Sequence, residues 1–291
     1  TAVRKLLDAS PKGTYQGIIP VDFAGRAVDM EEFRKLADEY NLWILEDACH
    51  APGGYFIDSN NDKQFCGNGK YADLAIFSFH PVKHITCGEG GMITTNDENL
   101  YNKLLLYRTH GITKGDLMFP FVNSIEFATG GYKDESEYPS WYMEMQELGY
   151  NYRLTDFQAV LGNSQLKRAD EGLKRRREIA EIYNQAFSGK DYVLGQSGVV
   201  DGHAYHLYVI EVKDRLNLYR HLREQNIFTQ IHYIPTPLMP YYKQFGYKEG
   251  NLPHAENYYK HCTSLPMFPT LTNDDQQCII HTINNFYSNK K

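Results

Sequence analysis

Leu74-Ala75-Ile76-Phe77-Ser78-Phe79-His80-Pro81-Val82-Lys83 is the stretch of this chain that decides its fold. Its first four residues form a continuous apolar run, which is typical of a strand covered on both faces by helices. Pro81 disfavours a helix after the strand, so we expect Lys83 on a defined loop. Partial burial there would depress the pKa of the lysine and make its amine nucleophilic. The alternative is an ordinary solvated lysine on a surface loop.

A second apolar run, Leu42 to Leu45, ends in the two acids Glu46 and Asp47. Ligands of open α/β sheets bind at the carboxyl ends of the strands, so an acid at this position is well placed for a site. A carboxylate that follows four apolar residues stays ionised only beside a cation or several donors. The protonated ring nitrogen of a cofactor would serve; otherwise Asp47 caps a helix or lies on a surface turn.

Strand and helix patterns alternate around these runs, which predicts an α/β sheet domain. Asp29 is expected to cap the first long helix, with Glu32 completing a capping box. The predicted elements are strands at residues 17–23, 42–45, 74–77 and 92–95 and helices at residues 30–40 and 97–108.

The C-terminal half carries an irregular aromatic segment and then a second alternating unit. The irregular segment, residues 115–146, is expected to be an ordered flap or a subunit contact. Thr155 is expected to cap one long helix that runs past Arg177. The second unit is predicted to hold strands at residues 205–212 and 229–234 and helices at residues 214–225 and 274–287. We therefore expect a large domain at residues 1–172 and a small α/β domain at residues 173–291.

Composition narrows the function classes. The 291 residues include 30 basic and 36 acidic side chains, a net charge of −6, and the densest basic run is residues 174–177, so nucleic acid is not an expected partner. No apolar run approaches the roughly 20 residues that span a bilayer, and no membrane partner is expected. The five cysteines have no paired spacing, which favours reduced thiols and a cytoplasmic location.

His80, His84 and Cys87 offer a competing hypothesis, a zinc site. Two histidines four residues apart bind zinc well on one helical face, but Pro81 disfavours that helix, and no further ligand pair follows at zinc-site spacing. No metal is therefore expected.

Several segments in this order form a recognisable pattern. The sequence resembles the pyridoxal-phosphate (PLP) dependent nucleotide-sugar aminotransferases of the DegT/StrS family. The segments that match are Glu46-Asp47-Ala48-Cys49-His50-Ala51, Phe77 to Lys83, Gly149-Tyr150-Asn151-Tyr152-Arg153, His232-Tyr233-Ile234-Pro235 and Ser264-Leu265-Pro266. The resemblance implies a fold type I transferase, PLP as cofactor, glutamate as amino donor and a homodimer with shared active sites. Within the family it favours the pseudaminic acid branch, which aminates a UDP-linked 4-keto-6-deoxy sugar.

The resemblance also implies roles for individual residues. Lys83 would be the Schiff-base lysine and proton shuttle, and Asp47 would pair with the pyridine nitrogen. His50 would lie against the cofactor ring near its phenolic oxygen. The other implied positions are Ser78 at the phosphate, Asn151 at the same phosphate from the neighbouring subunit, and Arg153, His232 and Tyr233 near the substrate.

Family members carry a further N-terminal segment with a phosphate-binding loop and an aromatic residue that stacks on the ring. We expect the large domain to be N-terminally truncated in this chain and its PLP affinity to be weak. The alternatives are a UDP-4-keto-pentose aminotransferase of lipid A modification, whose branch has a similar stretch at residues 85–87, and a non-catalytic nucleotide-sugar-binding fragment.

Overall fold

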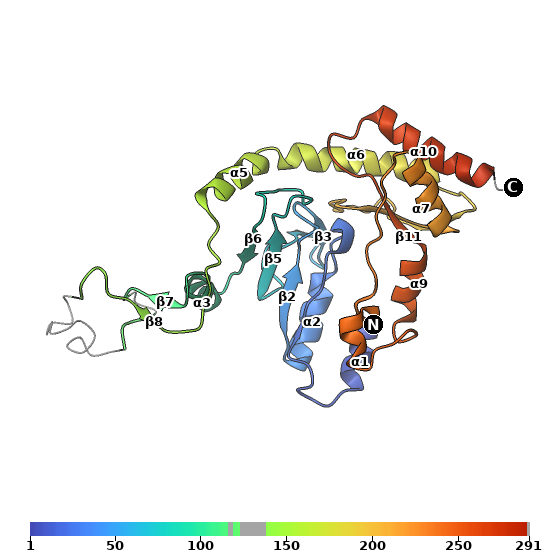
Figure 1. The fold of residues 1–291 in the computed structure, drawn as a ribbon. Helices are drawn as coiled ribbons and strands as arrows, with labels where there is room; N and C mark the ends of the chain where they lie inside the picture. Colours follow the sequence, from blue (N-terminus) through green and yellow to red (C-terminus); the bar gives the residue numbers. More distant parts are fainter. Residues whose placement is uncertain (116–118, 123–137, 290–291) are drawn as a thin grey trace.

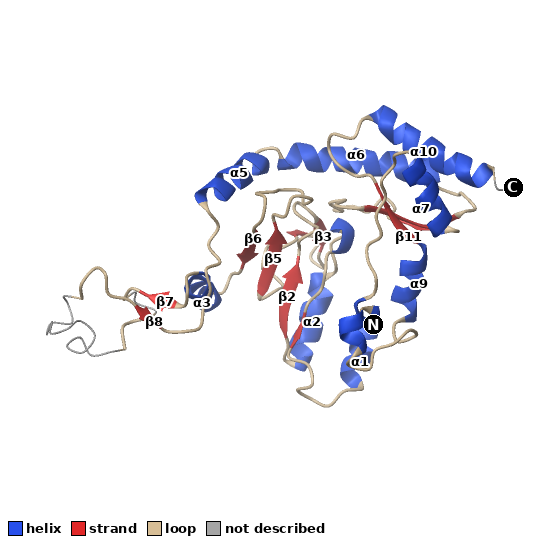
Figure 2. Cartoon of the chain, in the orientation of Figure 1, coloured by secondary structure: helices blue, strands red, loops and turns tan. Residues whose placement is uncertain are grey.

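Two larger sheets, each with helices packed on it, organise the residues that the structure describes. These are residues 1–115, 119–122 and 138–289 of a computed structural model (Figures 1 and 2). The first sheet lies in the N-terminal half of the chain and the second in the C-terminal half. The long helix α6 (Ala169–Phe187) belongs to the second sheet's core and reaches back toward the first.

The first sheet has the strand order β1-β2-β5-β6. Its strands are β1 (Gly17–Ile18), β2 (Trp43–Asp47), β5 (Leu74–Ser78) and β6 (Gly91–Thr94). The first three run parallel and β6 is antiparallel to β5, so β2 and β5 end at the same edge. That edge carries Asp47 and Ser78, as the sequence predicts for a ligand site.

Helix α2 (Met30–Tyr40) covers one face of this sheet and begins where predicted. The Asp29 side chain accepts from the Glu32 amide at 3.1 Å, which is one half of the expected capping box. α1 (Ala2–Asp8) also contributes to this core. The buried apolar residues here are Leu7, Met30, Leu36, Ala37, Leu42, Ile44 and Ala72.

The prediction that the strands at residues 42–45 and 74–77 are covered on both faces is wrong for the described part of the first one. Trp43 of β2 is 47% exposed, and Ile93 on the same face is 48% exposed. Leu45 and Ile76 share this face and are only half-buried, although both are apolar.

The predicted strand at residues 17–23 is also too long, because β1 ends at Ile18 and Ile19 and Val21 are exposed.

The second sheet is antiparallel, with the strand order β11-β10-β9. Aromatic and aliphatic side chains from the strands and helices form its core, with Tyr183, Phe187, Tyr208 and Leu222 fully buried. Its elements are β9 (Val193–Gln196), β10 (Tyr208–Val212), β11 (Cys262–Leu265), α6, α7 (Arg215–Glu224), α9 (Pro253–His261) and α10 (Asn273–Ser288).

Two predictions for this unit need correction. Residues 229–234 form no strand, only a single bridge between Gln230 and Ser264. β10 begins at Tyr208 rather than Tyr205, because Tyr205 has a positive φ of 47° that is incompatible with a strand. The proposed domain boundary at residue 172 falls within the continuous helix α6, and it stays a prediction.

The segment between the two units stands apart from the first sheet as an arm. It contains α3 (Glu98–Arg108), β7 (Ile112–Thr113) and β8 (Glu144–Met145), at the end of the molecule opposite the C-terminus in Figure 1. Within the irregular segment, Phe121, Tyr138 and Tyr142 pack with ring centroids 4.3–5.0 Å apart. Most of the rest of that segment lies outside the described residues.

Helix α5 (Asp156–Leu166) leads from the arm back to α6. Thr155 caps it in a complete capping box with Gln158, as expected for the cap. The prediction of one long helix from Thr155 past Arg177 is wrong, because Lys167 and Arg168 separate α5 from α6. α5 has no buried residue.

Short elements complete the described fold. They are η1 (Phe23–Gly25), β3 (Tyr55–Ile57), β4 (Lys63–Phe65), η3 (Thr236–Leu238) and α8 (Pro240–Lys243). No helix among the described residues has the length and apolar character needed to cross a membrane.

Candidate active site

Lys83 lies on a loop that is tied at both ends to the edge of the first sheet. β5 ends at Ser78, which pairs with Gly91 of β6. Beyond it the Phe79 amide donates to the Gly90 carbonyl at 2.8 Å, and the Cys87 amide donates to the Phe79 carbonyl at 3.0 Å. A side chain at Gly90 would meet the Cys87 sulfur at 2.6 Å, so glycine is required at this closure. The loop therefore holds Lys83 in a defined position.

The Lys83 side chain is partly buried among groups that determine its charge state. Burial lowers the pKa of Lys83, and the nearby Cys49 and Asp47 partly offset this. Among the described residues the Lys83 amine forms no salt bridge. An amine that is half-desolvated and unpaired has the properties of a nucleophile or a proton carrier.

Asp47 lies at the carboxyl end of β2, next to β5 in the sheet. The Cys49 amide donates to its Oδ1 at 3.1 Å, and the Asp47 amide donates to the Pro20 carbonyl at 2.9 Å. Burial and the hydrogen bond to Asp47 raise the pKa of the Cys49 thiol to about 12, so the thiol stays protonated. Asp47 is also close enough to Lys83 to interact with it electrostatically. Its pairing with the pyridine nitrogen stays a prediction.

His50 follows three residues later and is buried. Its Nδ1 accepts from the Ala24 amide at 3.3 Å. Burial, and then the positive charge of Lys83, lower the pKa of His50 to about 4, so the ring is neutral near pH 7. Because Nδ1 accepts, the ring proton is on Nε2, and His50 can donate from that nitrogen.

His206 and Phe23 pack on His50. The ring centroids of His50 and His206 are 4.3 Å apart, and those of His50 and Phe23 are 6.1 Å apart. Neither residue was identified from the sequence. His206 lies on the loop just before β10, and no local sequence signal places it against a residue 156 positions earlier.

His232 also lies near Lys83, and Tyr233 lies beside it. Burial and then the charge of Lys83 lower the pKa of His232, whose Nδ1 lies 2.8 Å from the Ser264 hydroxyl oxygen. Tyr233 is 52% exposed and packs edge-on against Phe23, with centroids 6.2 Å apart. The structure thus brings Asp47, Lys83, His50 and His232 together in one chain, with Tyr233 at the margin.

Lys83 also borders a cavity of about 710 Å³ whose other walls are α6 and residues 267–270. Arg168 and Arg175 line it as well, and Glu171 is the acid on the same wall. A cavity with this excess of cationic side chains suits an anionic ligand.

Asn151 and Arg153 lie elsewhere. Asn151 forms a bridge with Thr109 at the end of α3, and Arg153 lines a cavity against α3. Both residues are exposed and lie beside α3 in the arm, whereas Lys83 lies on the loop that follows β5 of the first sheet. A single chain therefore does not bring them to the Lys83 site.

The competing zinc set does not come together either. His84 is half-buried near His206, at 5.4 Å between centroids, while His80 is exposed and its Nε2 lies 3.9 Å from Glu89 Oε1. Among the described residues, the potential ligand atoms that do converge are those of Asp22, Glu46 and Cys66.

Known proteins are similar to this chain in sequence and in fold. A sequence profile of the DegT/DnrJ/EryC1/StrS aminotransferase family matches residues 4–284. The UDP-4-amino-4,6-dideoxy-N-acetyl-beta-L-altrosamine transaminase of Campylobacter jejuni is 35% identical over 270 residues, which are 90% of this chain and 63% of the relative. The chain spans about two thirds of the length of the curated relatives it matches.

Solved structures agree with this assignment. Helicobacter pylori PseC, an aminotransferase involved in the biosynthesis of pseudoaminic acid, superposes with a TM-score of 0.81 at 29% identity, covering 98% of this chain and 70% of that one. A putative sugar aminotransferase of Streptococcus pneumoniae in its PLP form superposes with a TM-score of 0.77 at 26% identity, covering 98% and 71%.

A mixed sheet with an aspartate and a loop lysine at one edge, followed by a small antiparallel unit, defines an aminotransferase of fold type I. The predicted fold class is confirmed. The chain belongs to the DegT/DnrJ/EryC1/StrS aminotransferase family.

Proposed function

We propose that the protein transfers an amino group to a UDP-linked 4-keto-6-deoxy sugar, with PLP as cofactor and glutamate as amino donor. The observation that carries the proposal is the half-buried, unpaired amine of Lys83 beside Asp47. The names of the Campylobacter relative and of PseC support the sugar class. Glutamate as donor rests on the family resemblance, and the cysteines, all free, support a cytoplasmic location.

The donor set at the sheet edge fits PLP. The site offers an amine, a carboxylate, a neutral imidazole that donates, and the Ser78 hydroxyl, which accepts only a weak 3.4 Å contact from the His80 amide. These groups match the aldehyde, the pyridine nitrogen, the phenolic oxygen and the phosphate of PLP in turn. When bound, PLP supplies an electron-poor ring that accepts the electron pair released as the carbon bearing the nitrogen loses its proton.

Each of these residues would then have a separate role in the reaction. Lys83 holds the cofactor and carries the proton at its Nζ, a task that its lowered pKa favours. Asp47 supplies the side-chain oxygens that would pair with the ring nitrogen. His50 donates from Nε2 and remains neutral throughout, because burial disfavours its charged form.

Two copies would complete the site. The exposed surface from the arm through α5 is rich in large apolar side chains, among them Trp141, Leu148, Tyr152, Phe157 and Val160, at 62–92% exposed. Several large apolar side chains exposed on one segment of the chain favour an interaction surface. We propose that this surface contacts a second copy and that Asn151 and Arg153 serve the partner's site.

Reduction of the PLP-loaded protein with borohydride tests the proposal. It should attach the cofactor to the Lys83 peptide and to no other lysine. Lys83→Arg should abolish amino transfer from glutamate, because a guanidinium cannot form the imine, while the exposed Lys190→Arg should behave as wild type. Comparison of UDP-4-keto-6-deoxy-N-acetylhexosamine with a UDP-4-keto pentose identifies the sugar. Label on another lysine, or full activity in Lys83→Arg, would refute the proposed role.

A further inference from the structure

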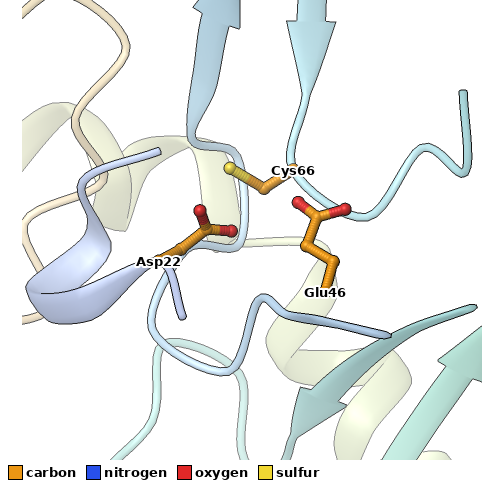
Figure 3. A group of neighbouring side chains, drawn as sticks. All are labelled: Asp22, Glu46 and Cys66. Carbon is orange, nitrogen blue, oxygen red and sulfur yellow. The ribbon is translucent and has the colours of Figure 1, made fainter. Parts of the chain in front are cut away.

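Two carboxyl groups and a thiol lie together directly behind Asp47 without a cation. Asp22 is 0% exposed, Glu46 3% and Cys66 8%. Their carboxylate and sulfur atoms lie within 4.8 Å of one another, and Figure 3 shows all three side chains turned toward a common point. Among the described residues no salt bridge reaches either acid.

The backbone satisfies only part of this cluster. The Val28 amide donates to Asp22 Oδ1 at 2.9 Å, and the Gly67 amide donates to Glu46 Oε1 at 2.9 Å. The other oxygen of Asp22, Oδ2, is buried and receives no such donor in the described part of the chain. Because Asp22 is fully buried beside Glu46 and Cys66, a proton within the cluster is the donor that would satisfy this oxygen.

Two carboxylates at this separation and burial cannot both be ionised. Burial, and then the charge of Asp22, raise the pKa of Glu46 well above its ordinary range. Burial also raises the pKa of Asp22, but the Val28 amide and the Cys66 thiol stabilise its charged form. The proton therefore belongs on Glu46 and the charge on Asp22, and burial keeps the Cys66 thiol protonated by raising its pKa.

Asp22 is linked to Asp47 through the backbone and through charge. Its amide donates to the Asp47 carbonyl at 3.0 Å, and the two carboxylates interact electrostatically. Glu46 precedes Asp47 on β2, and its side chain points to the opposite face of the sheet. The cluster therefore directly contacts the segment that positions Asp47, the proposed partner of the cofactor ring.

We propose that Asp22 and Glu46 share one proton, and that the single negative charge left on Asp22 acts through Asp47 to keep a bound pyridine ring protonated. Asp22 and Glu46 are then positioning residues, a role that rests on the proposed function. The groups that face the pair are Asp47 and Cys66, and neither is a cation.

The shared proton is tested without any cofactor. A carboxyl with a raised pKa in the folded state contributes stability that is complete below its unfolded pKa and is lost as pH rises through its folded pKa. The buried neutral histidines act in the opposite direction, because their pKa values are lowered, and they contribute equally to the wild type and to Glu46→Gln. Relative to Glu46→Gln, thermal unfolding of the wild type should therefore lose stability between about pH 5 and about pH 8, with about one extra proton taken up on folding. Glu46→Gln keeps a neutral donor and should remove this dependence, while the exposed Glu224→Gln should retain it.

A second measurement covers the case in which Glu46→Gln does not fold. The infrared spectrum of the wild type at neutral pH should show the carbonyl band of a protonated carboxylic acid, and Asp22→Asn should shift that band, because it replaces the charged acceptor of the Glu46 proton by a neutral one. Absence of that band, an unchanged pH slope in Glu46→Gln, or a stoichiometric metal ion found by elemental analysis would each overturn the shared proton.

The link to Asp47 is read from the PLP-loaded protein. Asp22→Asn should slow the single-turnover reaction with glutamate about tenfold and change the absorption spectrum of the bound cofactor, as expected when one nearby charge is removed. Glu224→Gln should change neither. An unaltered spectrum and rate in Asp22→Asn would overturn the link to Asp47. A wild type that binds no PLP would overturn both this link and the proposed function. The pH dependence of stability would still stand in that case, because it is measured without PLP.

Discussion

Lys83 and Asp47 show how neighbours determine the chemistry of a residue. Burial lowers the pKa of the lysine, and the nearby Cys49 and Asp47 offset part of this effect. The chemistry of the amine is thus determined by the groups around it. His50 differs, because burial and the charge of Lys83 act on it in the same direction.

Replacement of Asp47 by Asn tests its role at this scale. The substitution keeps the shape of the side chain and an oxygen that can accept from the Cys49 amide, but removes the negative charge. The half-reaction with glutamate should slow by about a hundredfold or more, because a neutral ring accepts electrons poorly. Stopped-flow absorption measures this rate, and the same spectra report whether PLP is still bound. An unchanged rate with bound PLP would exclude the role.

At the scale of elements, α5 is the helix whose sequence and environment disagree. Thr155 and Gln158 cap it completely, so its start is locally encoded. Its apolar side chains nevertheless face solvent, and Phe157 is 92% exposed. A helix with a good cap and no buried residue needs a partner to cover its apolar side chains.

Phe157→Asp tests whether a second copy is that partner. The side chain makes little contact within its own chain, so the folded protomer should keep its melting temperature at low concentration. A dimer built on this surface should dissociate, because a carboxylate would be buried without a partner. Light scattering coupled to size-exclusion chromatography reads the mass. Val199→Asp, at a site that is 71% exposed on the small unit, is the matched control; equal masses for both variants and the wild type would contradict the proposal.

On the scale of the whole molecule, the proposed site is distributed between the arm and the rest of the chain. Asp47, His50, Lys83 and His232 lie together. Asn151 instead pairs with Thr109 at the end of α3, in the arm. A two-fold dimer would exchange the arms symmetrically, so each site would be built from both chains.

A mixed-dimer experiment tests this arrangement. Lys83→Ala and Asn151→Ala should each be nearly inactive as homodimers. If Asn151 serves the opposite site, a heterodimer places both lesions in one site and leaves the other intact. Refolded equal mixtures should then recover about a quarter of wild-type activity, from half the sites in half the dimers. Failure to recover activity in mixtures shown to contain heterodimers would mean that Asn151 acts within its own chain or not at all.

Much of the fold could be predicted because its signals are local. The helices at residues 30–40 and 273–288 follow from apolar periodicity, and the cap residues Asp29 and Thr155 act within one turn. The proximity of Asp47 and Lys83 also follows from sequence, because the carboxyl ends of adjacent parallel strands meet at one edge. The family pattern adds residue roles, which stay predictions until they are measured.

Tertiary structure decided what depends on contacts between distant segments. The contact of His206 with His50 joins the two units of the fold, and the Asp22–Glu46–Cys66 cluster joins three segments. Hydrophobic periodicity in the sequence predicts neither contact, because the residues next to each of these side chains in the sequence carry no signal for a distant partner. The break between α5 and α6 and the single bridge at residues 229–234 also differ from what the sequence predicts, because local propensity allows longer elements there and does not fix where they end.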